Sequence, residues 1–248
     1  MYLFNDEDLN RNQFFRFNKK LVLNMTWGFL PLNAQAVLPV LLAHANGKGQ
    51  AWPSEETISA LSGLSPKTVR KGINELLALP GFKFDWQMTA TGRKSKKFTL
   101  PMPTSDNRFT ENDKFFFFHK FILTGGNWRL LKPIAKAVYP VLRTFSVWDK
   151  GEAEEAGLID NADGDYKDAY AQREWEYSEL EPGMIGRYAG IERARVYGAL
   201  RNLEERNLLE RCGERRKVFF IPPQYYKRAF LNEQLMKSFA HRRESENG

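Results

Sequence analysis

Side chains capable of catalysis or metal binding are few in this sequence and lie far apart. The three histidines, His44, His119 and His241, lack the H-x-H or H-x-E-x-x-H spacing that brings two ligands to one metal ion. A DNA-nicking enzyme needs a histidine pair beside a nucleophilic tyrosine, and the sequence has Tyr225 and Tyr226 but no such histidine pair. No phosphate-binding loop or nucleophile elbow is present. The sequence therefore predicts no enzyme, no metal site and no cofactor.

Basic residues, by contrast, recur on one side of a predicted helix that spans residues 66–77. The apolar positions Val69, Ile73, Leu76 and Leu77 have the spacing of a face that packs on a core. The opposite face is polar and basic, and its residues are Lys67, Thr68, Arg70, Lys71 and Asn74. Ser65 precedes this helix as the expected N-cap, and Pro66 suits its first turn.

A second helix of the same kind is expected at residues 193–203. Its inward positions are Val196, Leu200 and Leu203, and its outward residues are Arg193, Arg195, Tyr197 and Arg201. Each basic helix follows a short helix and a glycine turn, at Gly63 and at Gly190. A helix exposed in this way fits the major groove of duplex DNA, which is about 12 Å wide. The alternative is an ordinary amphipathic hairpin with a solvated charged face.

A β-hairpin with a basic tip is expected after each of these helices, at residues 82–100 and 208–221. The basic residues are Arg93, Lys94, Lys96 and Lys97 in the first hairpin, and Arg215, Arg216 and Lys217 in the second. Such hairpins can reach phosphates that flank the groove. Charged residues on edge strands also protect against aggregation, which is the alternative interpretation. Cys212, the only cysteine, is expected to be a core residue of the second hairpin.

An internal repeat relates the two parts of the chain. With a shift of 101 residues, Trp27 falls on Trp128, and AQAVLPVL at 34–41 falls on AKAVYPVL at 135–142. With a shift of 127 residues, 62–76 falls on 189–203. We interpret this as a duplication of one domain. In each copy a strand is expected first (14–23 and 115–123), then a helix in which Pro39 or Pro140 marks a kink or a boundary.

The predicted fold is therefore mainly α with small β-hairpin wings, in two tandem domains. Residues 1–110 form the first domain, 111–230 the second, and 231–248 a C-terminal helix or tail. The second domain carries an acidic insertion at about 149–178. We expect the aromatic run 115–118 to be a buried strand between the domains, with Phe117 facing the other way.

Charge is distributed unevenly along the 248 residues. The net charge is +7, yet residues 149–181 hold twelve Asp or Glu against three Lys or Arg. The rest of the chain is thus strongly basic, which favours a polyanionic partner. The acidic segment could mimic DNA, bind a protein or be a solvated loop. A single cysteine and the lack of a long apolar run are typical of a cytoplasmic protein without a membrane partner.

The duplicated arrangement resembles the tandem winged-helix replication initiators of plasmids and phages. The resemblance spans about residues 14–228 and depends on PSEETISALSGLSPKTVRKGINEL, GMIGRYAGIERARVYGALRNLEERNLL and the hairpin after each. Residues 149–181 have no counterpart in those families, whose first domains also carry longer dimerisation elements. By position, the resemblance implies recognition-helix contacts at Lys67, Thr68, Arg70, Lys71 and Asn74, and at Arg193, Arg195 and Tyr197.

We therefore expect sequence-specific binding of double-stranded DNA, at an asymmetric site of about 20 base pairs that spans two major-groove segments. Further candidate partners are a second copy of the chain and host replication proteins. Two alternatives remain open. A winged-helix transcription regulator would bind a palindrome as a symmetric dimer, and a protein-docking module would use the basic faces for acidic partners.

Overall fold

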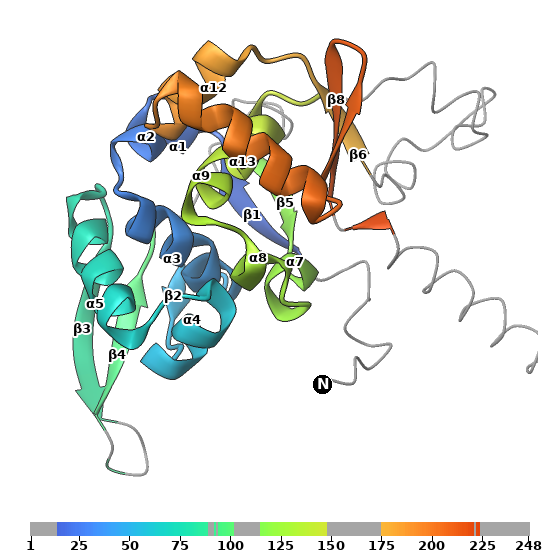
Figure 1. Cartoon of the computed structure of the whole chain (residues 1–248). Coiled ribbons are helices and arrows are strands. Elements are labelled where there is room, and N and C mark those ends of the chain that lie inside the picture. Colours follow the sequence, from blue (N-terminus) through green and yellow to red (C-terminus); the bar gives the residue numbers. More distant parts are fainter. Residues whose placement is uncertain are drawn as a thin grey trace, which may run out of the picture.

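A computed structural model describes residues 14–88, 92, 94–101, 115–147, 175–220, 222 and 223. These residues form a mixed α+β fold with small antiparallel sheets (Figure 1). The predicted α+β class is confirmed. The predicted tail at 231–248, the tip residue Arg93 and most of the acidic insertion lie outside the described residues.

The described part of the first half begins with a strand and ends with a hairpin. Its elements are β1 (Phe14–Asn18), α1 (Lys20–Leu23), α2 (Thr26–Phe29), α3 (Leu32–Ala43), β2 (Gln50–Ala51), α4 (Glu55–Ser62), α5 (Pro66–Glu75), the 3-10 turn η2 (Leu76–Ala78), β3 (Lys83–Met88) and β4 (Lys94–Thr99). Strands β2, β4 and β3 form one antiparallel sheet in that order.

The second half has the same order of strands and α-helices. Its elements are β5 (Phe115–His119), α7 (Phe121–Thr124), α8 (Asn127–Leu130), α9 (Pro133–Thr144), β6 (Trp175–Ser178), α12 (Pro182–Ala189), α13 (Arg193–Glu205), β7 (Leu209–Cys212) and β8 (Arg215–Phe219). Its three-stranded sheet has the order β6-β8-β7. None of the helices described here is long and apolar enough to cross a membrane.

Strands β1 and β5 pair antiparallel and join the two halves. Their register places Phe17 opposite Phe116 and Phe15 opposite Phe118, and the rings of each pair stack. The expected buried strand between the halves is therefore confirmed, and Phe117 is 43% exposed on the other face. Both strands are shorter than predicted. At the end of β1, the Asn18 carboxamide accepts a hydrogen bond from the Lys20 N–H, where α1 begins.

Helices α3 and α9 lie in the centre of the fold and pack against each other. Pro39 and Pro140 lie inside them, and neither helix ends there, so of the two predicted alternatives, a kink or a boundary, the boundary is excluded. A proline removes one hydrogen bond from the helix ladder. Three residues before each proline, the carbonyl of Ala36 or of Ala137 accepts a hydrogen bond from an indole of the other half.

Contacts between the halves come in pairs. Moving the residues of one contact by the repeat shifts of 101 and 127 residues gives the residues of the other contact. Trp27 Nε1 donates to the Ala137 carbonyl at 2.8 Å, and Trp128 Nε1 donates to the Ala36 carbonyl at 3.0 Å. Short helices of each half also pack on the opposite half. Helix α2 contacts α12, and α7 and α8 contact α4 (Figure 1).

A second reciprocal pair connects α3 and α9 to the ends of α4 and α12. Gln35 Nε2 donates to the Ala189 carbonyl at 3.0 Å. At the position 101 residues later, Lys136 Nζ donates to the Ser62 carbonyl at 2.7 Å. The halves are thus held together by paired hydrogen bonds as well as by the ribbon of β1 and β5.

Two expectations about single positions need correction. Leu77 was expected to face inward, but α5 ends at Glu75 and the 3-10 turn that follows leaves this side chain 52% exposed. Cys212 is a free, half-buried cysteine at the end of β7 rather than a core residue. Residues 175–178, at the end of the predicted acidic insertion, form β6, which pairs with β8.

Candidate nucleic-acid interface

Helices α4 and α5 are joined by a tight turn, and both begin with a serine cap. Ser54 Oγ accepts from the Thr57 N–H at 3.1 Å, and Ser65 Oγ accepts from the Thr68 N–H at 3.3 Å. Gly63 ends α4 in the left-handed conformation at φ 72°, which a side chain disfavours. The predicted cap at Ser65 and the predicted turn at Gly63 are confirmed, and Ser54 forms a second cap of the same kind.

Helix α5 has one buried face and one exposed face. Val69 and Ile73 are fully buried, and Gly72 lies so close to Asn33 of α3 that a Cβ there would be 2.8 Å from the Asn33 carbonyl oxygen. Thr68 is half-buried. The remaining sequence-predicted residues of this helix are exposed, namely Ser65, Lys67, Arg70, Lys71 and Asn74. The structure thus brings the predicted residues to one solvent-facing surface, which we call the α5 outer face.

A glutamate at the start of α4 links this face to the first hairpin. Glu55 Oε2 accepts from Arg70 Nε at 2.8 Å, and Glu55 Oε1 accepts from Lys96 Nζ of β4 at 2.8 Å. Lys96 also lies over the rings of Phe84 and Trp86, and its side chain is only 14% exposed. Sequence reasoning did not single out Glu55, because it lies fifteen residues from Arg70 and on another helix.

The protonation of Glu55 responds to these neighbours. Burial is the largest single influence and raises the pKa of the Glu55 carboxyl. The hydrogen bonds and charges of Lys96 and Arg70 together outweigh it and bring that pKa below its ordinary value. Glu55 is therefore ionised at neutral pH, and its two oxygens bridge α5 and β4.

Helices α12 and α13 repeat this geometry in the second half. Gly190 ends α12 at φ 70°, and Val196 and Leu203 are fully buried. All four sequence-predicted residues of α13 are exposed: Arg193, Arg195, Tyr197 and Arg201. We call this surface the α13 outer face. Neither helix of this pair has a side-chain cap, because Glu181 and Glu192 stand at the N-cap positions.

Among the described residues, the ion-pair cluster of the first half has no copy in the second. With the shift of 127 residues, Pro182 stands in the place of Glu55 and Tyr197 in the place of Arg70. Arg216 of β8 instead donates to the Leu180 carbonyl at 3.0 Å. The two outer faces therefore have different chemistry at the corresponding point.

The two hairpins present their basic residues in different ways. Lys94 is exposed, and Lys97 lies 6.0 Å from the ring centroid of Trp52. In the second hairpin, Arg215 lies over Tyr177 at 4.2 Å and Lys217 over Trp175 at 4.4 Å. These cation–π contacts hold the basic groups at the sheet surface while leaving them partly accessible.

Two arginines face each other across the second hairpin. Arg211 of β7 pairs directly with Arg216 of β8. Burial lowers the pKa of Arg216, and the neighbouring charge of Arg211 acts in the same direction. Like charges directly opposite each other destabilise a hairpin. No carboxylate of the described residues forms an ion pair with either arginine.

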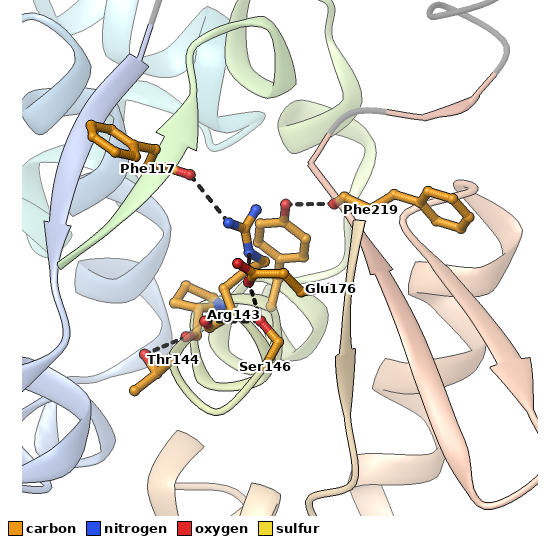
Figure 2. A network of polar contacts seen from close by, with 8 residues as sticks. Phe117, Arg143, Thr144, Ser146, Glu176 and Phe219 are labelled. Atoms are coloured by element: carbon orange, nitrogen blue, oxygen red, sulfur yellow. Dashed lines mark hydrogen bonds and ion pairs between the residues drawn. The ribbon is translucent and has the colours of Figure 1, made fainter. Parts of the chain in front are cut away.

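A buried polar network attaches the second sheet to the rest of the molecule (Figure 2). Arg143 of α9 lies 3.7 Å from Glu176 of β6, and Ser146 Oγ donates to the same carboxylate oxygen at 2.6 Å. Tyr139 donates its hydroxyl proton to the Phe219 carbonyl at 2.8 Å. Because these groups are buried, we assign them a structural role in holding β6 and β8 against α9.

A family model described as a helix-turn-helix domain matches a segment of the first half. The match covers residues 28–79 and thus α3, α4 and α5 with the α5 outer face. Residues 28–79 are thus similar to a helix-turn-helix domain. A helix-turn-helix domain suggests DNA binding, and the second of its two turn-linked helices is the one that enters the major groove. No curated protein and no solved structure matches this chain.

Proposed function

We propose that this protein binds double-stranded DNA in a sequence-specific manner, with α5 and α13 as the two helices that enter the major groove. The α5 outer face carries the proposal. It lies on the second turn-linked helix of a matched helix-turn-helix domain and exposes Lys67, Arg70, Lys71 and Asn74. The opposite side of the same helix is buried, so these side chains are held at a fixed surface.

Features of the second half support the proposal that it is a second DNA-binding unit. Its elements follow the same order, its helix pair turns at Gly190, and the α13 outer face is basic and exposed. We infer that the two halves are copies of one winged-helix domain, because the contacts of Trp27 and Trp128 exchange under the shift that relates the sequences. The chain would then present two fixed units to one asymmetric DNA site.

The second hairpin is expected to contact phosphates. The facing pair Arg211 and Arg216 forms no ion pair with a carboxylate among the residues described, and the charge of Glu204 offsets the lowering of the Arg216 pKa only in part. A phosphate group between or beside the two guanidinium groups would relieve their repulsion. Lys94 in the first hairpin is exposed and suits the same role. Lys96 has a different role in this proposal, since its ammonium group is held by Glu55.

We further propose that the protein is a replication initiator of a plasmid, phage or other mobile element. It rests on the resemblance of the tandem arrangement, which the reciprocal contacts support. A transcription regulator is the second candidate, and its expected target is a palindrome bound by two chains.

In vitro selection of random duplexes at near-physiological salt tests the proposal. We expect recovery of one asymmetric motif of about 20 base pairs. Binding to that motif should weaken as salt rises, with a slope of about 0.9 log units per phosphate neutralised. A recovered palindrome would favour the regulator. Failure to enrich any duplex, together with weak binding at low salt, would contradict the proposed function.

Charge-removing variants with a matched control locate the interface. The double variant Lys67→Ala/Lys71→Ala removes two exposed amines from the α5 outer face, and Lys48→Ala removes one from the loop that precedes β2. Fluorescence anisotropy at several salt concentrations should show a smaller salt slope for the double variant. Lys48→Ala should keep the slope of the unmodified protein. Equal slopes in all three would exclude α5 from the interface.

A further inference from the structure

Glu55 lies where three elements meet, and each of its two carboxylate oxygens has one basic partner. Oε2 accepts from Arg70 Nε of α5, and Oε1 accepts from Lys96 Nζ of β4, both at 2.8 Å. The carboxylate and the Lys96 amine are largely covered, whereas the Arg70 side chain is 61% exposed. The Glu55–Lys96 pair is therefore largely covered, whereas the guanidinium group of Arg70 extends from it into solvent.

The hydrogen bond from Nε determines which edge of the Arg70 guanidinium remains available. Nε is the only nitrogen of Arg70 that has a partner among the described residues. Nη1 and Nη2 are thus left as a parallel pair of donors at the exposed end. The guanine edge in the major groove offers two acceptors, O6 and N7, and a forked arginine can satisfy both at once. A free arginine side chain loses rotamer freedom when it binds in this way.

We propose that Glu55 is a positioning residue that orients the Nη pair of Arg70 toward a guanine in the major groove. Lys96 balances the charge of Glu55, so that the carboxylate adds no net repulsion toward the phosphates. This inference rests on the proposed DNA binding and adds a specific base contact to it. Since Pro182 and Tyr197 occupy the corresponding places in the second half, only the first unit reads a guanine in this way.

The test compares Glu55→Gln with Glu56→Gln in the full-length chain. Both variants remove one negative charge from the first turn of α4, but Glu56 is exposed and forms no ion pair with Arg70. Selection and competition binding measure the preference for guanine at each position of the motif. A bidentate arginine–guanine pair gives a preference of roughly 5- to 150-fold. We expect Glu55→Gln to reduce this preference at one position to within about twofold of unity, and Glu56→Gln to retain it.

A modified base makes the readout specific to the proposed contact. Replacing the guanine by 7-deazaguanine removes the N7 acceptor. The unmodified protein should bind the 7-deazaguanine duplex more weakly than the guanine duplex. The Glu55→Gln variant should bind the two duplexes with nearly the same affinity. Arg70→Lys keeps the charge and the Glu55–Lys96 pair but removes the fork, so it should behave like Glu55→Gln. The salt slope should stay unchanged in both variants, because no phosphate contact is removed.

The outcomes separate this inference from the proposed function. If Glu55→Gln keeps the guanine preference while Arg70→Lys loses it, Glu55 does not position Arg70 and the inference is wrong. If both variants keep it, Arg70 reads no guanine. If loss of affinity is uniform over all sequences and accompanies a lower melting temperature, Glu55 has a purely structural role. Absence of DNA binding by the unmodified protein would overturn the proposed function itself.

Discussion

The indole N–H of Trp27 donates a hydrogen bond to the backbone carbonyl of Ala137, 2.8 Å away in the other half of the chain. Trp128, which follows Trp27 by 101 residues, makes the corresponding bond to Ala36 at 3.0 Å. Both indoles are fully buried. Each half therefore completes the packing of the other, and the distance between the two outer faces is set within the protein. In the proposed DNA complex, this arrangement favours one fixed spacing between the two bound segments.

We predict that alanine at Gly63 or Gly190 strongly destabilises the fold. Both glycines have a positive φ, which costs a residue with a side chain about 1–2 kcal/mol. A Cβ at Gly63 would also collide with the Arg129 carbonyl, and one at Gly190 with the Gly28 carbonyl. The loss of unfolding free energy should therefore be well above 2 kcal/mol in each variant. Urea unfolding monitored by circular dichroism measures it.

Gly213 provides the matched control for this prediction. Its φ is 61°, and a Cβ there would have no atom within 4 Å. Gly213→Ala should cost only the conformational penalty of about 1–2 kcal/mol. If all three alanine variants lost the same amount of stability, the close approach of the two halves at Gly63 and Gly190 would be disproved.

His119 should make the stability depend on pH in the mildly acidic range. Burial, with a smaller contribution from the Arg143 charge, lowers the pKa of His119 from its ordinary value to about 4. Between pH 6.5 and 4 the unfolded chain thus binds a proton that the folded protein does not, so stability falls as pH falls. We expect a loss of about 2 kcal/mol from this group between pH 7.5 and pH 5.

The variant His119→Asn isolates that contribution. The histidine Nδ1 accepts a hydrogen bond from the Phe121 N–H at 3.1 Å, and an asparagine oxygen can accept in its place. Urea unfolding at pH 7.5 and pH 5 should show a smaller loss for the variant than for the unmodified protein. An identical loss in both proteins would mean that His119 takes up its proton in the folded state as readily as in the unfolded chain.

Lys136 should act in the alkaline range. Burial lowers the pKa of its amine to about 8, so between pH 8 and 10.5 only the unfolded chain holds the extra proton. Stability should therefore rise by about 2 kcal/mol between pH 7.5 and pH 9.5 through this group. Lys136→Gln places at this position the residue type found at Gln35, and it should lack that rise. Urea unfolding of both proteins at pH 7.5 and pH 9.5 measures this rise. A rise in unfolding free energy of equal size in the variant would contradict the prediction.

Local sequence patterns were sufficient to predict the helix-turn-helix elements. Ser54, Ser65 and Gly63 are signals for caps and a turn, and such signals act over three or four residues. The outward residues of α5 and α13 followed from helical spacing alone. The same reasoning failed at Leu77, because the change from α-helix to a 3-10 turn after Glu75 rotates the face that the spacing assumes.

By itself, the sequence determined the pattern of each half: which residues cap, turn, pack inward or face solvent, and that the two halves share one order. These properties depend on neighbours along the chain. Only the tertiary structure decided how the halves meet and which basic groups are available. Arg70 and Lys96 read alike in the sequence, and both form an ion pair with Glu55, yet the Lys96 side chain is 14% exposed and the Arg70 side chain 61%. Their difference arises from contacts over fifteen and forty-one residues, which no local period encodes.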